Sequence, residues 1–370
     1  MKQIVYADNA ATTKLDIEAF EAMKPFLLDD YSNPSQLYSF SRASKKALKE
    51  ARQTIADCIN AEPNEIFFTS GGSESDNWAI KGIAFNGEKG AILTSEIEHH
   101  AILRACAEVE SRGVPVAYIK PDEKGVISSR KLLEYITEGT KLVSVMFVNN
   151  EIGTIEPIKE LCEIAHSKGA LFHTDAVQAV GHIRIDVKEL GVDMLSASAH
   201  KFNGPKGVGF LYIKKGTNIK PYINGGAQEF GFRAGTENVA SIVGMAAALK
   251  NNCDSIDLNN THIEVLETAL LNGLEIAFKR NGSEYHAKGI INLSFNNQDG
   301  EAILHRLDLM GIMVSTGSAC DSVHTQVSHV LASIGLKDSL AKGTIRISLG
   351  KNNTMDDVDA IAKALNKILN

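Results

Sequence analysis

The sequence predicts an α/β fold in which a mostly parallel β-sheet carries helices on both faces and is followed by a smaller α+β domain. Two observations support this prediction. Apolar runs of strand length alternate with helical patterns through most of the chain, which is typical of repeated βαβ units. From residue 289 onward the order changes to strand, helix, helix, strand and helix, which indicates a second and smaller unit.

Seven segments have the length and apolar character of strands buried in a sheet. They are 66–69, 90–94, 114–119, 142–148, 170–174, 194–197 and 207–213. Helical patterns lie between them at 73–82, 101–112, 128–138 and 158–168, and a long helix at about 39–60 precedes them. Parallel sheets of this kind place ligand sites beyond the carboxyl ends of their strands.

A second long helix near 258–280 leads from the sheet to the smaller unit. The elements expected there are a strand at 290–295, helices at 301–310 and 328–335, a strand at 344–349 and a helix at 355–369. We therefore divide the chain into a large domain at 16–256 and a small domain formed by 1–15 together with 257–370.

Composition excludes several classes of protein. The 370 residues are 44% hydrophobic and 22% charged, which is close to the average for globular proteins. The net charge of −7 gives no general attraction to nucleic acid or to anionic lipid. The apolar runs are shorter than the roughly 20 residues of a membrane span, and Asp8 interrupts the place where a signal peptide would be apolar. We expect a cytoplasmic protein with no nucleic-acid or membrane partner.

The five cysteines do not encode a disulfide framework or a cysteine-rich zinc site, because their number is odd and no C-x-x-C pair occurs. We expect no metal. Cys58, Cys106 and Cys162 lie among helix formers and are interpreted as small buried residues, while Cys253 is interpreted as a surface turn residue. Cys320 lies among small polar residues typical of a loop, so it is either a candidate nucleophile or a plain loop cysteine.

Two predicted strands end in groups that suit charged ligands. Residues 66–74 form a strand, a glycine turn and a helix start, where free N–H groups and the Ser73 hydroxyl could hold an anion. Ser73 could instead be a helix N-cap. Asp175 ends a buried strand, and an acid there is costly unless it meets a positive partner such as a protonated ring nitrogen. The alternative is that Asp175 caps the next segment.

Two further strand ends carry a lysine and a histidine. Lys201 follows Ser198 and His200, and a partly desolvated lysine beside other cationic groups has the lowered pKa that suits Schiff-base formation. His99 follows the strand at 90–94. The alternatives are that Lys201 is a solvated loop lysine and that His99 is a structural histidine. The four strand ends converge on one rim, where their groups match pyridoxal phosphate (PLP): an anion cup, an acid for the pyridine nitrogen, a lysine for the aldehyde and an imidazole for the ring face.

A series of motifs then extends over essentially the whole chain. They are Tyr6-x-Asp8-Asn9-Ala10-Ala11-Thr12-Thr13, Asn33-Pro34-Ser35, Thr69-Ser70-Gly71, Glu74-Ser75-Asp76-Asn77, Glu98-His99-His100, Asn149-Asn150-Glu151-Ile152-Gly153, Asp175-Ala176-x-Gln178, Ser198-Ala199-His200-Lys201, Arg233-x-Gly235-Thr236-Glu237-Asn238, Gly317-Ser318-Ala319-Cys320 and Ile345-Arg346-Ile347-Ser348. In this order the motifs closely resemble those of the cysteine desulfurases of the class V aminotransferase superfamily, which are fold type I PLP enzymes.

The resemblance implies how the cofactor would be held. Lys201 would bond to it covalently, Asp175 would pair with its pyridinium nitrogen, and His99 would stack on its ring and move protons. The remaining cofactor contacts implied are Asn150 and Gln178 to the phenolic oxygen, and Gly72, Ser73, Ser198 and His200 to the phosphate. Thr236 would complete the phosphate site from the other subunit of a homodimer.

The resemblance also implies the reaction. Arg346 would bind the carboxylate of L-cysteine, with Asn150 beside it, because a planar and permanently charged fork suits a carboxylate. The Cys320 thiolate would take the substrate sulfur as a persulfide, leaving L-alanine, and would pass the sulfur to an acceptor protein for iron–sulfur clusters or thio-modification. Asp321 stands where a threonine is common in the family, and its carboxylate should raise the pKa of the neighbouring thiol.

Two alternatives stay open at this point. The chain could be a selenocysteine lyase or another class V PLP enzyme in which Cys320 is not essential. It could also be a sulfur-carrier or scaffold protein that kept the fold without the chemistry, although the presence of both Lys201 and Asp175 argues against that. Production of alanine and sulfide from L-cysteine would distinguish a cysteine desulfurase from these two alternatives.

Overall fold

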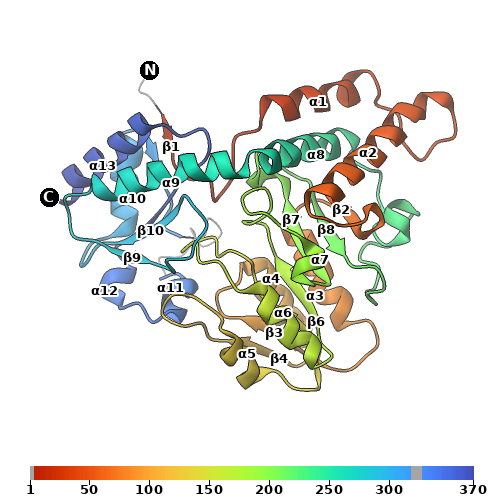
Figure 1. The fold of residues 1–370 in the computed structure, drawn as a ribbon, viewed down its shortest axis with the longest axis horizontal. Coiled ribbons are helices and arrows are strands. Elements are labelled where there is room, and N and C mark those ends of the chain that lie inside the picture. Colours follow the sequence, from red (N-terminus) through yellow and green to blue (C-terminus); the bar gives the residue numbers. More distant parts are fainter. Residues whose placement is uncertain (1–3, 318–326) are drawn as a thin grey trace.

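The computed structural model describes residues 4–317 and 327–370, which form a large sheet unit and a smaller unit joined by a long helical connection. The connection consists of α8 (Val239–Asp254) and α9 (Ile256–Asn272), which follow one another across the upper part of the molecule (Figure 1). Both termini lie on the side of the smaller unit.

A seven-stranded sheet in the order β2-β8-β7-β6-β5-β3-β4 forms the centre of the large unit. The strands β3, β4, β5, β6 and β7 are parallel, while β8 runs antiparallel to both β7 and β2. Their bounds are β2 (Ile66–Thr69), β3 (Ala91–Ser95), β4 (Val116–Ile119), β5 (Thr140–Ser144), β6 (Leu171–Asp175), β7 (Met194–Ser198) and β8 (Gly209–Ile213). The predicted α/β class and the mostly parallel sheet are confirmed.

Strand β5 differs most from its prediction, because it ends at Ser144 rather than at Val148. The chain after Ser144 still follows β6: the N–H groups of Val145 and Phe147 donate to the carbonyls of His173 and Asp175, at 3.2 and 2.8 Å. Residues 145–148 therefore remain buried beside the sheet without forming a regular ladder. This irregular path carries Asn149 and Asn150 beyond the end of the strand.

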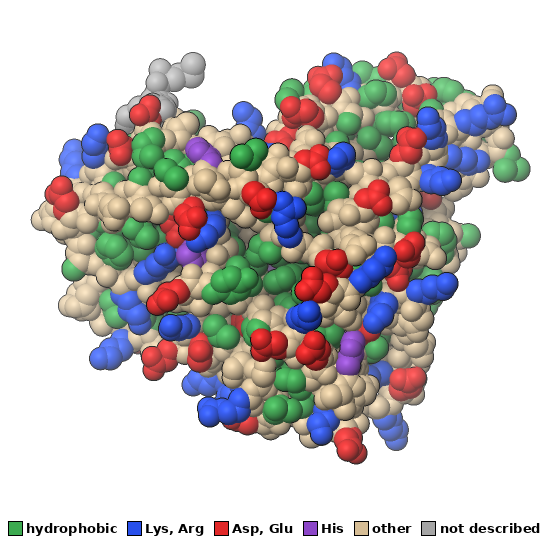
Figure 2. Space-filling model, in the orientation of Figure 1, with side chains coloured by type: hydrophobic (Ala, Val, Ile, Leu, Met, Phe, Trp, Pro, Cys, Tyr) green, Lys and Arg blue, Asp and Glu red, His purple; other side chains and the backbone are tan. Residues whose placement is uncertain are grey.

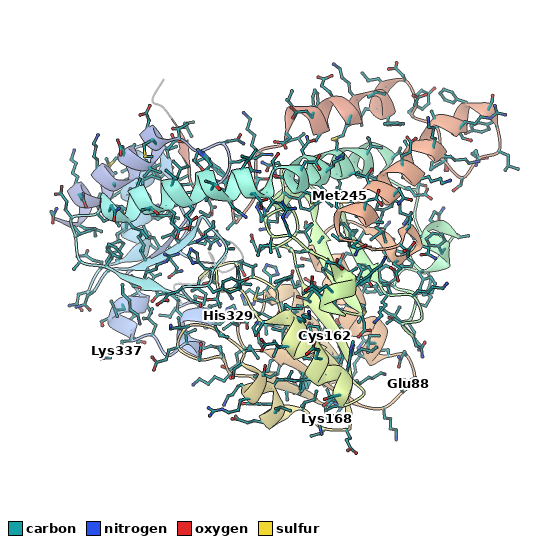
Figure 3. All side chains as sticks on the ribbon, viewed as in Figure 1. Glu88, Cys162, Lys168, Met245, His329 and Lys337 are labelled. Carbon is teal, nitrogen blue, oxygen red and sulfur yellow. The ribbon has the colours of Figure 1, made fainter. Side chains whose placement is uncertain are left out.

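Helices cover both faces of the sheet. One face packs against α3 (Gly72–Ala84) and α4 (His100–Ser111), in a core that includes Trp78, Ile92 and Leu211. The other face carries a larger core in which Phe172 and Leu195 meet the remaining helices. The helices on that side are α1 (Ile17–Leu28), α2 (Arg42–Cys58), α5 (Ser129–Tyr135), α6 (Ile158–Ser167), α7 (Val187–Leu190) and α8; Figure 3 labels Cys162 on α6 and Met245 on α8.

Among the described helices of ten residues or more, two were not predicted from sequence, and for opposite reasons. Helix α8 is buried around most of its circumference, so its apolar residues show no one-sided period. Helix α1 contains Pro25 and leaves several large apolar side chains exposed, among them Ile17 and Leu28. Cys253, which was expected in a surface turn, lies in the last turn of α8 and is half-buried.

The smaller unit has its own sheet and its own core. The sheet order is β12-β10-β9, all antiparallel, and a short parallel pair joins β1 to β11. The elements are β1 (Val5–Tyr6), β9 (Lys279–Asn281), β10 (Ile290–Ser294), α10 (Gly300–Leu309), β11 (Ile312–Met313), α11 (His329–Ser333), α12 (Asp338–Ala341), β12 (Thr344–Ser348) and α13 (Met355–Leu369). The helix expected at 258–280 is shorter, because α9 ends at Asn272 and β9 occupies 279–281.

Residues from both ends of the chain build the core of the smaller unit. Val5 and Ala7 pack with Leu293, Ile347 and Leu365 in a cluster separate from the cores of the large sheet. The domain boundaries at 16–256, and at 1–15 with 257–370, remain a prediction.

The surface carries both signs of charge interspersed, as the face in Figure 2 shows. Across residues 4–317 and 327–370, no helix combines the length and the apolar character that crossing a membrane requires.

The buried sheet core gives a first prediction. Leu195 on β7 is fully buried, so Leu195→Ala should lower the free energy of unfolding by about 2–5 kcal/mol through lost burial and the cavity left behind. The matched control is Leu258→Ala on α9, where the side chain is 76% exposed and the change should be within about 0.5 kcal/mol. Urea unfolding followed by circular dichroism measures both, and equal effects would contradict the assignment of the core.

Candidate active site

A cavity of about 440 Å³ opens at the carboxyl ends of the parallel strands. It gathers most of the residues that the sequence analysis selected: Gly72, Ser73, His99, Asn150, Asp175, Gln178, Ser198, His200, Lys201 and Arg346. Thr236 lies elsewhere, in a neighbouring pocket of about 150 Å³ that shares Ser70 and Gly207 with the cavity. Cys320 lies outside the described residues.

One end of the cavity is formed by the first turn of α3. Gly71 is the N-cap, with a φ of 146° that favours glycine, and no side chain of the described chain caps the helix. Ser73 is therefore the second residue of the helix, and its interpretation as an N-cap is wrong. The first N–H groups of an α-helix have no partner within the helix, so this turn offers donors to an anion.

Gly72, the second glycine of this turn, lies too close to neighbouring side chains for any other residue to fit. A Cβ on Gly72 would lie 2.6 Å from Cγ2 of Val177 and 3.7 Å from Cβ of Ser198. The helix end can approach the ends of β6 and β7 only because this position carries no side chain. Gly72, Ser73 and Ser198 together line a cup at this end of the cavity.

Asp175 is the last residue of β6 and is only 4% exposed. Its Oδ1 accepts a hydrogen bond of 2.9 Å from the N–H of Val177, so it does shape the turn that follows the strand, as the alternative interpretation held. Burial raises the pKa of Asp175 to about 6, although Val177 N–H and Lys201 act in the opposite direction. A buried carboxylate that lines a cavity suits a cationic partner.

Lys201 lies beyond β7, where its Nζ donates to the carbonyl oxygens of Ala10 and, at 2.9 Å, Ala11. The amide of Gln178 donates to the same Ala10 carbonyl at 2.9 Å. The N-terminal segment thus forms a wall of the cavity and holds the lysine side chain. Residues 6–13 form one of the motifs of the sequence, but none of the predicted site residues lies among them.

Two histidines of the site are positioned by local contacts. Nδ1 of His99 accepts a hydrogen bond of 3.2 Å from the N–H of Ala101 and so caps α4, which leaves the proton of the neutral ring on Nε2. His200 lies with Nδ1 3.1 Å from the Thr12 hydroxyl. Burial, with Lys201 and Lys206 nearby, lowers the pKa of His200 to about 4, so this ring is neutral at physiological pH.

Arg346 reaches the cavity from β12 of the smaller unit and is almost fully buried. Its Nη2 donates to Oδ1 of Asp8 at 2.6 Å and its Nη1 to the carbonyl of Asn150 at 2.9 Å. Its buried Nε has no hydrogen-bond partner among the described residues. These two bonds fix the orientation of the guanidinium, and Asp8, which was not among the predicted site residues, supplies one of them.

The residues on either side of 318–326 both lie beside Glu151, the neighbour of Asn150. The Ser328 hydroxyl donates to Oε2 of Glu151 at 2.6 Å, and a Cβ on Gly317 would lie 3.4 Å from the same oxygen. His329, labelled in Figure 3, follows on α11 and donates through Nε2 to the carbonyl of Glu98 at 3.0 Å. Gly317 and Ser328 therefore both lie next to a residue that adjoins the cavity wall.

Known proteins resemble this chain over nearly its whole length. The family model for aminotransferase class-V matches residues 5–361. The cysteine desulfurase IscS of Clostridium botulinum (strain Hall) is 50% identical, over all of this chain and 95% of its own length. The cysteine desulfurase NifS of Azotobacter vinelandii is 39% identical, over 99% of this chain and 92% of its own.

Solved structures show the same fold. A NifS-like protein superposes with a TM-score of 0.94 at 38% identity, covering 99% of both chains. A structure of SspA in complex with cysteine superposes with a TM-score of 0.85 at 36% identity, covering 96% of this chain and 100% of that one. The chain belongs to the class V aminotransferase superfamily and, within it, to the cysteine desulfurases, which are PLP-dependent enzymes of fold type I.

Proposed function

We propose that this chain removes sulfur from L-cysteine, with Lys201 as the residue that carries PLP and Cys320 as the thiol that accepts the sulfur. The observation that carries the proposal is one cavity that brings together the α3 anion cup, the buried carboxylate of Asp175, the Lys201 amine and the buried Arg346 guanidinium. The relatives named as cysteine desulfurases, and a relative whose structure holds cysteine, support the choice of substrate.

The residues present fit PLP. The uncapped first turn of α3 and the space at Gly72 suit a phosphate, which Ser73, Ser198 and His200 would help to hold. Asp175 would pair with the pyridinium nitrogen, and Asn150 and Gln178, which line the same cavity, would bond the phenolic oxygen. When bound, PLP withdraws electrons from the carbon atoms of an attached amino acid.

The remaining residues of the cavity move protons and bind substrate. Lys201 must lose a proton before its amine reacts, and its two carbonyl acceptors hold it close to the cavity until then. His99 would move protons through Nε2, because its Nδ1 is occupied by the α4 cap. The spare Nε–H of Arg346 would receive the substrate carboxylate, with Asn150 beside it.

Sulfur transfer to Cys320 balances as a displacement. The Cys320 thiolate attacks the substrate sulfur, an S–S bond forms while the C–S bond breaks, and the carbon keeps the electron pair and takes up protons to leave as alanine. Gly317 and Ser328, which flank Cys320 in the sequence, both lie beside Glu151, the neighbour of the cavity residue Asn150. The persulfide is then passed to an acceptor protein for iron–sulfur clusters or thio-modification.

We also infer a homodimer in which Thr236 completes the phosphate site of the partner subunit. Two observations support it. Thr236 does not line the cavity of its own chain. Large apolar side chains are exposed at residues 31–40 and in the loop before Thr236, including Tyr31 at 70%, Leu37 at 97% and Phe230 at 60%. Such exposure is typical of a surface that is covered by a partner.

The central prediction concerns Cys320. Wild-type protein incubated with L-cysteine and a reductant should release alanine and sulfide in equal amounts, while Cys320→Ser should lose persulfide formation and sulfide release by about a hundredfold or more, because its nucleophile is gone. Cys253→Ser is the matched control and should keep both activities. Full persulfide formation by Cys320→Ser would overturn the role of this thiol, and activity on selenocysteine alone would favour the alternative enzyme.

Shared sites can be tested by mixing two inactive variants. Lys201→Ala removes the amine, and Thr236→Glu places a like charge beside the phosphate. If Thr236 acts across the interface, subunit exchange should produce hybrid dimers with one intact site, so that about a quarter of all sites recover. No recovery in hybrids that light scattering shows to be dimeric would mean that Thr236 acts within its own chain.

Asp175 gives a prediction for the cofactor-free protein. Its folded pKa of about 6 lies above the unfolded value near 3.9, so the folded state binds more protons between these two pH values and the free energy of unfolding falls as the pH rises through them. Asp175→Asn does not titrate and should be more stable than wild type by about 1–3 kcal/mol above pH ~7. Urea unfolding across this range measures the difference, which should shrink toward pH ~4; a difference independent of pH would contradict the buried charge.

A further inference from the structure

A second buried acid lies next to Asp175. Asp76 is the fifth residue of α3, is 1% exposed and lines the same cavity. Its Oδ1 has no hydrogen-bond partner among the described residues, and the nearest basic atom is Nε2 of His173, 3.8 Å away. The proposed reaction uses Asp175 but gives Asp76 no task.

A chain of hydrogen bonds lies under the helix beside Asp76. The Ser196 hydroxyl lies 2.9 Å from Nε2 of His173, and this same nitrogen lies 3.8 Å from Oδ1 of Asp76. On the other side of the ring, Nδ1 of His173 lies 2.9 Å from the Ser144 hydroxyl. All four side chains are fully or almost fully buried.

Strand register explains why these groups meet. Ser144 on β5 is paired with His173 on β6, and Asp175 on β6 is paired with Ser196 on β7. His173 and Asp175 are two residues apart on one strand, so their side chains point to the same face of the sheet. Helix α3 packs on this face and brings Asp76 to the chain.

The protons of this chain can be counted. Burial lowers the pKa of His173 to about 3, so its ring is neutral and has one donor and one acceptor. The Ser196 and Ser144 hydroxyls bond to its two ring nitrogens, so one hydroxyl donates to the ring and the other accepts from it. The ring is therefore satisfied without a positive charge and offers no cation to Asp76.

An ionised Asp76 would face unfavourable surroundings. The charged groups that act on it most strongly, Asp175 and Glu98, are both acids, and burial together with Asp175 raises the pKa of Asp76 well above its usual value. Lys201 lies on the side of Asp175 and favours the charged form of that residue instead. Two adjacent buried carboxyl groups do not both ionise without a cation for each.

We propose that Asp76 is a positioning residue that stays uncharged behind Asp175 and so leaves Asp175 as the single anionic carboxylate facing the ring nitrogen of the cofactor. This inference rests on the proposed pairing of Asp175 with that nitrogen. It assigns the two acids different tasks: Asp175 carries the charge, and Asp76 carries a proton.

Infrared spectroscopy of the PLP-loaded enzyme tests the proton directly. Asp76→Asn should lose one carbonyl stretch of a protonated carboxylic acid at neutral pH. Glu98→Gln is the matched control, since burial raises the pKa of Glu98 to about 8 and its substitution should remove a different band. An unchanged carboxylic-acid region in Asp76→Asn would overturn the proposal, because Asp76 would then be ionised.

The ring nitrogen provides a second readout, through magnetic resonance of enzyme loaded with PLP that carries a heavy nitrogen isotope at this position. Asp76→Asn should keep the nitrogen protonated and PLP affinity within about threefold, because a neutral amide replaces a neutral acid. Asp76→Leu, which replaces the carboxyl group in the cavity wall with an apolar side chain, should weaken PLP binding by about tenfold or more.

The two readouts separate failure of this inference from failure of the proposed role of Asp175. Loss of the nitrogen proton in Asp76→Asn would overturn the neutral state of Asp76, because it would show that Asp76 supplies the charge. Loss of the proton in Asp175→Asn alone is the expected result. Retention of the proton in Asp175→Asn, with the infrared band still lost in Asp76→Asn, would refute the role of Asp175 and leave Asp76 uncharged as inferred.

Discussion

Asp175 carries a charge at the end of a buried strand, and much of the active site follows from the cost of keeping it there. A carboxylate that is 4% exposed has lost most of its hydration, so it needs donors or a cation. The chain supplies one N–H donor at Val177 and the positive charge of Lys201, and the cofactor would supply the rest. The neutral state inferred for Asp76 has the same cause: a second buried charge beside Asp175 would have no partner.

A second constraint connects the two units of the molecule. Arg346 is fully buried on β12, where its guanidinium bonds to Asp8 near the N-terminus and to the backbone of Asn150 beyond β5. Residues from three distant parts of the sequence meet at this one group. The same N-terminal segment offers the carbonyls of Ala10 and Ala11 to Lys201, so it links the substrate-binding end of the cavity to its lysine. Losing this segment would therefore disturb both ends of the site.

Most of the fold could be predicted from sequence, because the strands of a parallel sheet are continuous apolar runs separated by helices. The errors occurred where local pattern and tertiary environment differ. Helix α8 is buried on most sides and shows no period, while β5 ends early although the chain continues beside β6. Ser73 resembles an N-cap by residue type, yet Gly71 is the N-cap, because the close approach to Val177 and Ser198 requires glycines in this turn.

The sequence by itself determined the class of fold, the residues at the strand ends and, through its motifs, the family and cofactor, because these depend on residue type, spacing and order. Only the tertiary structure decided which groups share a proton or a charge. Three sets of contacts join residues on separate strands, helices and loops. They are the pairing of Arg346 with Asp8, the wall formed by Ala10 and Ala11, and the hydrogen bonds from Ser144 through His173 to Ser196 beside Asp76. Burial and distance set these ionisation states, and neither can be read from a linear pattern.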